Sequence, residues 1–156
     1  MLTLMPLACV TTSSFPGLVV SKRHARFGIE KPLAGWHKKS FRGADLYLEH
    51  ESKNASVFFN AQCEKISDSP LEALVAQLLV DMGKYEVISE KRLMLDNREA
   101  LITEVNINLD GVKRYTKMMV YRKGPCVFDG VFNAPVHNEL AADFDSFVQS
   151  FWAEAQ

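Results

Sequence analysis

Three cysteines and four histidines are the first candidates in this chain for binding a zinc ion or for thiol-based attack on a substrate. Cys9, Cys63 and Cys126 form no CxxC pair, and the histidines are scattered singly. A structural zinc site needs four such ligands at close spacing, and a reactive thiolate needs a base or a positive charge beside it. The sequence therefore predicts no metal site, no cofactor and no cysteine-dependent catalysis.

Two pairs of carboxylates have a spacing that invites an acid–base interpretation. Glu49 and Glu51 share one face of a predicted strand, and Asp143 and Asp145 lie on the polar face of a predicted helix. Both pairs are typical of ordinary surface charge. The chain has no HExxH motif, EF-hand loop, phosphate-binding glycine loop or GxSxG elbow. We therefore expect a protein without enzymatic activity.

The start of the chain could carry a membrane anchor. The segment from Leu4 to Cys9 resembles the end of a bacterial lipoprotein signal, with Ala8 directly before the cysteine to be lipidated. Pro6 stands where such signals usually have leucine, and no basic residue precedes the run, so we expect that the natural chain starts further upstream. We predict lipidation at Cys9, with residues 1–20 as signal remnant and flexible tether. The alternative is a frayed apolar end with an incidental cysteine.

Length and charge narrow the classes of partner. The chain has 156 residues and a formal net charge of −1, so one domain with a real core is expected at 21–156, without general attraction to nucleic acid. Basic clusters at 22–26 and 38–42 are expected to be solvated loops. No apolar run approaches the roughly 20 residues of a membrane-spanning helix.

Two segments have the periodicity of amphipathic helices. The run 69–72 has a serine N-cap, a proline at the first helical position and a glutamate that can close a capping box, and one apolar stripe then extends to Met82. The second helix closes the chain. Pro135 and Asn138 mark its start, and its apolar face runs over 140–152.

Elsewhere the apolar period changes to two, which is typical of strands. Strands are predicted at 44–49, 56–63, 85–95, 100–109, 112–122 and 126–133. Asp110-Gly111 is a hairpin signal, and apolar residues on both faces of the last strand indicate a central position. Consecutive hairpins predict an α+β fold, with a mainly antiparallel sheet covered by helices.

Several short motifs point to a known family. They are Gly35-Trp36 after Pro32, 45–48, 69–72, 95–100, 109–111, 124–129 and 143–148. From about residue 25 to the end, the chain resembles a PsbP-like family of bacterial lipoproteins, similar in fold to the extrinsic PsbP subunit of photosystem II and to a yeast Ran-binding import factor. The resemblance implies a central antiparallel sheet of about six to seven strands sandwiched by helices.

Cys63 ends one predicted strand and Cys126 begins another, so the two could be neighbours in space. We predict a disulfide between them if the chain is exported to an oxidising periplasm, and the family resemblance implies cysteines at the same two places. The alternative is a pair of buried thiols in a cytoplasmic protein.

The predicted function is recognition. We expect a non-enzymatic exported lipoprotein, tethered in the periplasm by a lipid anchor, that binds a protein or another cell-envelope component and no nucleic acid. Loops around Trp36, Pro135 and His137 are the candidate binding residues, although Trp36 could instead plug one end of the sheet. One alternative is a small-ligand carrier or hydrolase with an internal pocket. Another is a cytoplasmic partner of a GTPase.

Overall fold

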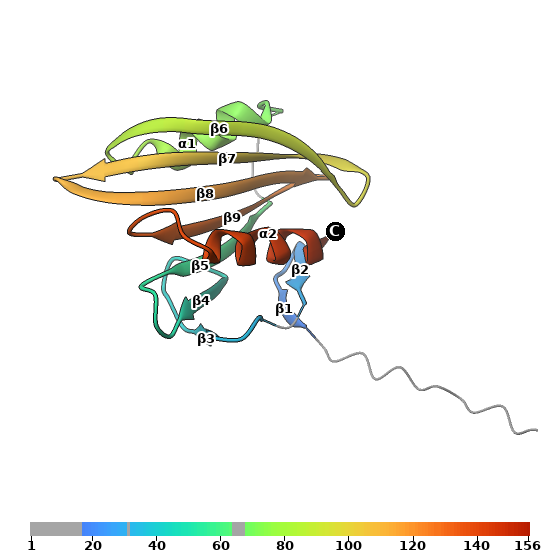
Figure 1. Cartoon of the computed structure of the whole chain (residues 1–156). Coiled ribbons are helices and arrows are strands. Elements are labelled where there is room, and N and C mark those ends of the chain that lie inside the picture. Colours follow the sequence, from blue (N-terminus) through green and yellow to red (C-terminus); the bar gives the residue numbers. More distant parts are fainter. Residues whose placement is uncertain (1–16, 31, 64–67) are drawn as a thin grey trace, which may run out of the picture.

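Seven strands form an antiparallel sheet at the centre of this computed structural model, in the order β3-β4-β5-β9-β8-β7-β6 (Figure 1). They are β3 (Trp36–Lys39), β4 (Leu46–His50), β5 (Ser56–Gln62), β6 (Lys84–Leu95), β7 (Arg98–Leu109), β8 (Val112–Lys123) and β9 (Cys126–Ala134). The structure describes residues 17–30, 32–63 and 68–156. Strands β6 to β9 are consecutive hairpins, as the alternating sequence predicts, and β5 joins them by pairing with β9.

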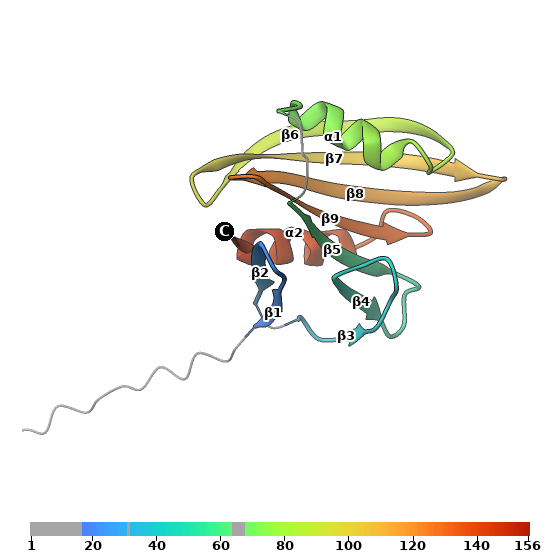
Figure 2. The same ribbon diagram turned by 180° about the vertical axis from the view of Figure 1, so that it is seen from behind.

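The two helices of the described residues cover opposite faces of this sheet. Helix α2 (Leu140–Ser150) lies in front of the sheet in Figure 1, and α1 (Leu71–Leu79) lies in front of it in the reverse view of Figure 2. Leu74, Val75 and Leu79 of α1 pack on one face, and Phe144 and Phe147 of α2 pack on the other. The α+β fold with a central, helix-covered antiparallel sheet is therefore confirmed. Within the described residues, no helix has the length and apolar character needed to span a membrane.

A second, three-stranded sheet was not predicted from the sequence. It pairs β1 (Leu18–Ser21), β2 (Ala25–Ile29) and β10 (Trp152–Ala155) in the order β1-β2-β10. The predicted final helix is too long, because α2 ends at Ser150 and Trp152 begins a strand. The ring of Trp152 lies so close to Gly28 of β2 that a Cβ there would come within 2.8 Å of it. Pairing with β2 thus outweighs the helical periodicity.

The start of α1 also differs slightly from the prediction. Pro70 is the N-cap, with an extended ψ of 158°, so the helix begins at Leu71 and Ser69 precedes the cap. The start of α2 agrees with the sequence, because Asn138 Oδ1 accepts a hydrogen bond from the backbone N–H of Leu140 at 2.9 Å.

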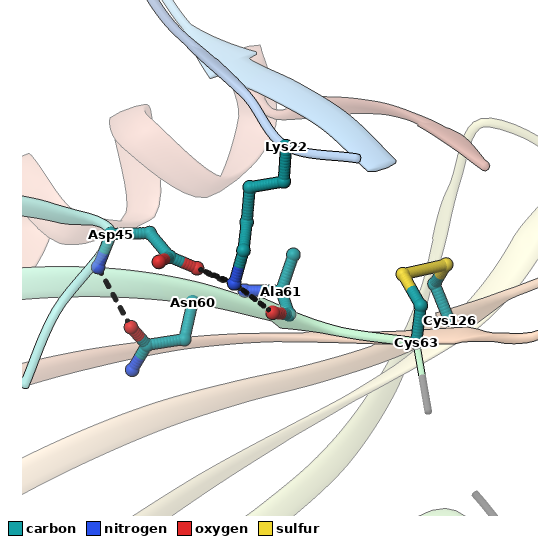
Figure 3. A network of polar contacts seen from close by, with 6 residues as sticks. All are labelled: Lys22, Asp45, Asn60, Ala61, Cys63 and Cys126. Atoms are coloured by element: carbon teal, nitrogen blue, oxygen red, sulfur yellow. Dashed lines mark hydrogen bonds and ion pairs between the residues drawn. A yellow bond between two sulfur atoms is a disulfide. The ribbon is translucent and has the colours of Figure 1, made fainter. Parts of the chain in front are cut away.

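The last residues of β5 extend past the start of β4 and have no strand partner on that side. A polar network forms hydrogen bonds with the backbone there. Asp45 Oδ2 accepts a hydrogen bond from the backbone N–H of Ala61 at 2.9 Å, and Lys22 Nζ donates to the carbonyl of Ala61 at 2.8 Å (Figure 3). Lys22 also pairs with Asp45 at 2.9 Å. Since Lys22 follows β1, the network joins the small sheet to the large one.

Candidate binding site

A concave site lies where β6 begins, β7 ends and β8 begins. Its cavity has a volume of about 470 Å³, and we call it the end pocket. It is lined by Lys84, Tyr85, Glu86, Asn106, Ile107, Asn108, Lys113, Arg114, Pro135, Val136 and His137.

Strand register arranges the floor of the end pocket in rows. Lys84, Asn108 and Lys113 are direct neighbours across β6, β7 and β8 and form the first row. The second row consists of Glu86 on β6, Asn106 on β7 and Tyr115 on β8. Directly paired residues share one face of an antiparallel sheet, so these polar side chains point to the side that carries α2.

The loop between β9 and α2 forms the rim of the end pocket. Pro135, Val136 and His137 line it, and the valine is 65% exposed. The imidazole of His137 lies edge-on to the ring of Tyr115, with 4.9 Å between the ring centroids. The structure thus places two of the predicted binding residues, Pro135 and His137, together in one pocket.

Trp36, the third predicted binding residue, is not in the end pocket. It is only 4% exposed, and its indole N–H donates to Asp143 Oδ2 of α2 at 2.8 Å. Its ring packs edge-on against Phe147, with centroids 5.6 Å apart. Of the two alternatives for Trp36, the structure therefore supports a buried side chain that closes one end of the sheet rather than an exposed binding residue.

A buried lysine lies one row beyond the end pocket. The side chain of Lys117 on β8 is 5% exposed, and its Nζ is 3.1 Å from Glu104 Oε1 of β7 and 2.7 Å from Asp145 Oδ1 of α2. Helix α2 is thereby bound to the sheet through charge as well as through its phenylalanines. Asp145, taken in the sequence for surface charge, is half of this contact.

The electrostatics of this cluster favour its charged form. Burial lowers the pKa of Lys117, but the hydrogen bonds from its ammonium to Asp145 and Glu104 outweigh burial and raise it. Burial likewise raises the pKa of Glu104, but the bond and charge of Lys117 produce a net lowering. Burial, followed by the charge of Glu104, raises the pKa of Tyr115, so its phenol is neutral beside the end pocket.

Comparison with known proteins concerns the fold. No protein-family model and no curated protein matches the sequence. The structure matches that of cyanobacterial PsbP (CyanoP) from Synechocystis sp. PCC 6803 with a TM-score of 0.56 and 13% identity, over 96% of this chain and 100% of that one. The fold is PsbP-like. LpqN, involved in cell envelope biogenesis of Mycobacterium tuberculosis, matches with a TM-score of 0.58 and 9% identity, over 90% of this chain and 87% of that one.

The predicted cysteine pairing is present in the PsbP-like domain. Cys63 follows β5, Cys126 begins β9, and a disulfide joins them across the two paired strands (Figure 3). Cys9, the predicted lipidation site, lies outside the described residues. Among the residues that the structure describes, no group of three or more His, Cys, Asp or Glu side chains is placed to hold a metal ion.

Asp129 is an acidic group in an apolar setting on the α1 side of the sheet. It neighbours Asn60 of β5 across the β5–β9 pair, and its Oδ2 is buried. Burial raises the pKa of Asp129 to about 6, although a hydrogen bond with Asn60 opposes this and the charge of Asp45 adds to it.

Replacing Asp129 with asparagine should therefore stabilise the domain at neutral pH by about 2 kcal/mol. The folded state favours the protonated acid, so the stabilising contribution of this group is complete below pH about 4 and is lost as pH rises through about 6. Urea unfolding of Asp129→Asn and wild type from pH 4 to pH 8 should give stabilities that separate between pH about 4 and about 6 and then differ by a constant amount up to pH 8. The exposed Glu90→Gln on β6 is the control, and an equal gain in both variants would contradict the prediction.

Proposed function

We propose that this PsbP-like domain is an exported, lipid-anchored accessory protein that binds a cell-envelope component through the end pocket. The observation that carries the proposal is the end pocket itself. It is open, it gathers amides and charged groups from three strands, and its rim includes the predicted residues Pro135 and His137. This composition suits recognition of a polar ligand.

Two further observations support export and an envelope role. Disulfides persist in oxidising compartments such as the periplasm and are rare in the cytosol, so the Cys63–Cys126 bond favours an exported protein over the cytoplasmic GTPase partner. The similarity to LpqN, whose own role lies in cell envelope biogenesis, is in keeping with this at the level of the fold. A lipid on Cys9 would tether the domain through the residues that precede β1.

Intact mass of the full chain from membranes of its own host tests the proposal. We expect an added acylglyceryl mass starting at Cys9, and alkylation of two cysteines only after reduction. The Cys9→Ser variant should lose the added mass and the membrane association while keeping the disulfide. An unlipidated chain with three free thiols would exclude the exported lipoprotein.

A further inference from the structure

The first row of the end pocket places two ammonium groups on either side of an amide. Lys84 and Lys113 are both exposed, and neither forms an ion pair with any residue within 17–30, 32–63 and 68–156. Asn108 lies between them, and its Oδ1 already accepts a hydrogen bond from the backbone N–H of Gly111 at 2.9 Å. Its amide NH₂ is the group left to donate. The row therefore offers donors and positive charge.

We propose that this row binds the anionic group, a phosphate or a carboxylate, of the ligand of the end pocket. The inference rests on the proposed function for its use of the end pocket as the binding surface, and it adds the chemical class of the ligand. Two ammonium groups and an amide on one face match the charge and the acceptor oxygens of such an anion. Arg114 also lines the pocket, but its Nε donates to Asn133 Oδ1 at 2.7 Å, so we assign the charge to the lysines.

The second row defines what stands beside the anion. Glu86 and Asn106 are neighbours across β6 and β7, directly behind the two lysines. A carboxylate accepts hydrogen bonds and repels an anion, so the part of the ligand that reaches Glu86 must carry a hydroxyl or amino group. The rim adds the exposed side chains of Val136 and His137 for contact with a less polar part.

The position of the end pocket indicates the source of the anion. The turn between β7 and β8 lies at one end of the domain, next to Asn108 of β7 and Lys113 of β8, and β1 lies toward the other end in both views (Figures 1 and 2). An anchor placed before β1 leaves the pocket on the side away from the tether. We therefore assign the anion to a soluble molecule rather than to the headgroups of the anchoring membrane, an assignment that holds only if the chain is anchored through Cys9.

Amide chemical shifts of the full, oxidised chain during titration with glycerol 3-phosphate test this assignment. The probe carries a phosphate and adjacent hydroxyls, as the two rows require. Shifts should concentrate at positions 106–108 and 113, and added salt should weaken binding. The Lys84→Gln/Lys113→Gln variant should bind at least about tenfold more weakly. Glu86→Gln should bind inorganic phosphate about threefold more tightly, because it removes a repulsive charge.

The opposite signs of these two variants separate charge recognition from a loss of structure. The control Lys38→Gln/Lys91→Gln removes the same charge from exposed positions outside the end pocket and should bind like wild type. No shifts in the end pocket, or equal affinity in the Lys84→Gln/Lys113→Gln variant, would show that the lysines are ordinary solvated charges and would overturn the inference. Binding only to vesicles of phosphatidylglycerol in phosphatidylcholine would overturn the assigned source. The outcomes with glycerol 3-phosphate and inorganic phosphate do not depend on whether Cys9 is lipidated, and the vesicle comparison uses the Cys9→Ser chain, which has no lipid to insert.

Discussion

Replacing Lys117 with methionine should lower the free energy of unfolding by about 3 kcal/mol. The side chain is 5% exposed and neutralises Glu104 of β7 and Asp145 of α2 at the same time. Its removal leaves Glu104 partly buried without a cation, and this cost exceeds the gain from burying an apolar chain. The loss falls at the lower end of the range for broken buried pairs, because Asp145 remains half exposed and keeps its water.

Urea unfolding at pH 7 measures the effect of this change, and Lys91→Met on the exposed strand β6 is the matched control. The effect should fade as pH falls below about 4, where carboxylates become protonated. The double variant Lys117→Met/Glu104→Gln should recover part of the loss, since it removes the orphaned charge as well. If Lys117→Met and Lys91→Met had the same free energy of unfolding, the cluster of Lys117, Glu104 and Asp145 would contribute no net stability.

Removing the disulfide should have an effect of similar size, about 4 kcal/mol. The bond joins Cys63 and Cys126 across a sequence separation of 63 residues, so its loss frees a long loop in the unfolded chain. Cys126 is fully buried at the start of β9, and its replacement adds a small packing loss.

The comparison is best made in a Cys9→Ala background, which prevents thiol exchange with the third cysteine. Cys63→Ala/Cys126→Ala should unfold at a lower urea concentration and with a steeper dependence on urea, because its unfolded state is more expanded. Cys9→Ala alone should match wild type. An unchanged urea midpoint in the variant that lacks both Cys63 and Cys126 would mean that strain or residual structure cancels the loop constraint.

The longer strands and the short strand β4 could be predicted from the sequence, and the other short strands could not. Strands β6 to β8 each contain enough alternating residues to show a period of two, and Asp110-Gly111 fixes one of their turns. The four or five residues of β1, β2, β3 and β10 are too few for such a pattern. In addition, Phe151 and Trp152 continue the helical spacing of α2, so only the contact with β2 reveals that the last segment is a strand.

The candidate site was only partly predictable for a related reason. Pro135 and His137 stand in a recognisable loop, whereas Lys84 and Lys113 are far apart in the chain and become neighbours only through the register of three strands. One signal did exist in the sequence of β7, because the polar positions of its alternating pattern include Asn106 and Asn108 near its end. Lys117 also stands out as a single charge in a largely uncharged stretch of β8, but its partner Asp145 belongs to another element, α2, and their contact cannot be derived from spacing.

The pairing of β5 with β9 has a consequence for the order of folding. Strands β6 to β9 are joined by tight turns and can pair through contacts that are local in sequence. The pairing of β5 with β9 instead joins segments that are separated by α1 and strands β6 to β8. The pairing of β2 with β10 joins segments near the two ends of the described chain. Long-range pairings of this kind form slowly. Docking of β5 on β9 brings Cys63 and Cys126 together, so we expect their oxidation to be fastest once these two strands have paired. The disulfide thus stabilises the register in which β5 pairs with β9.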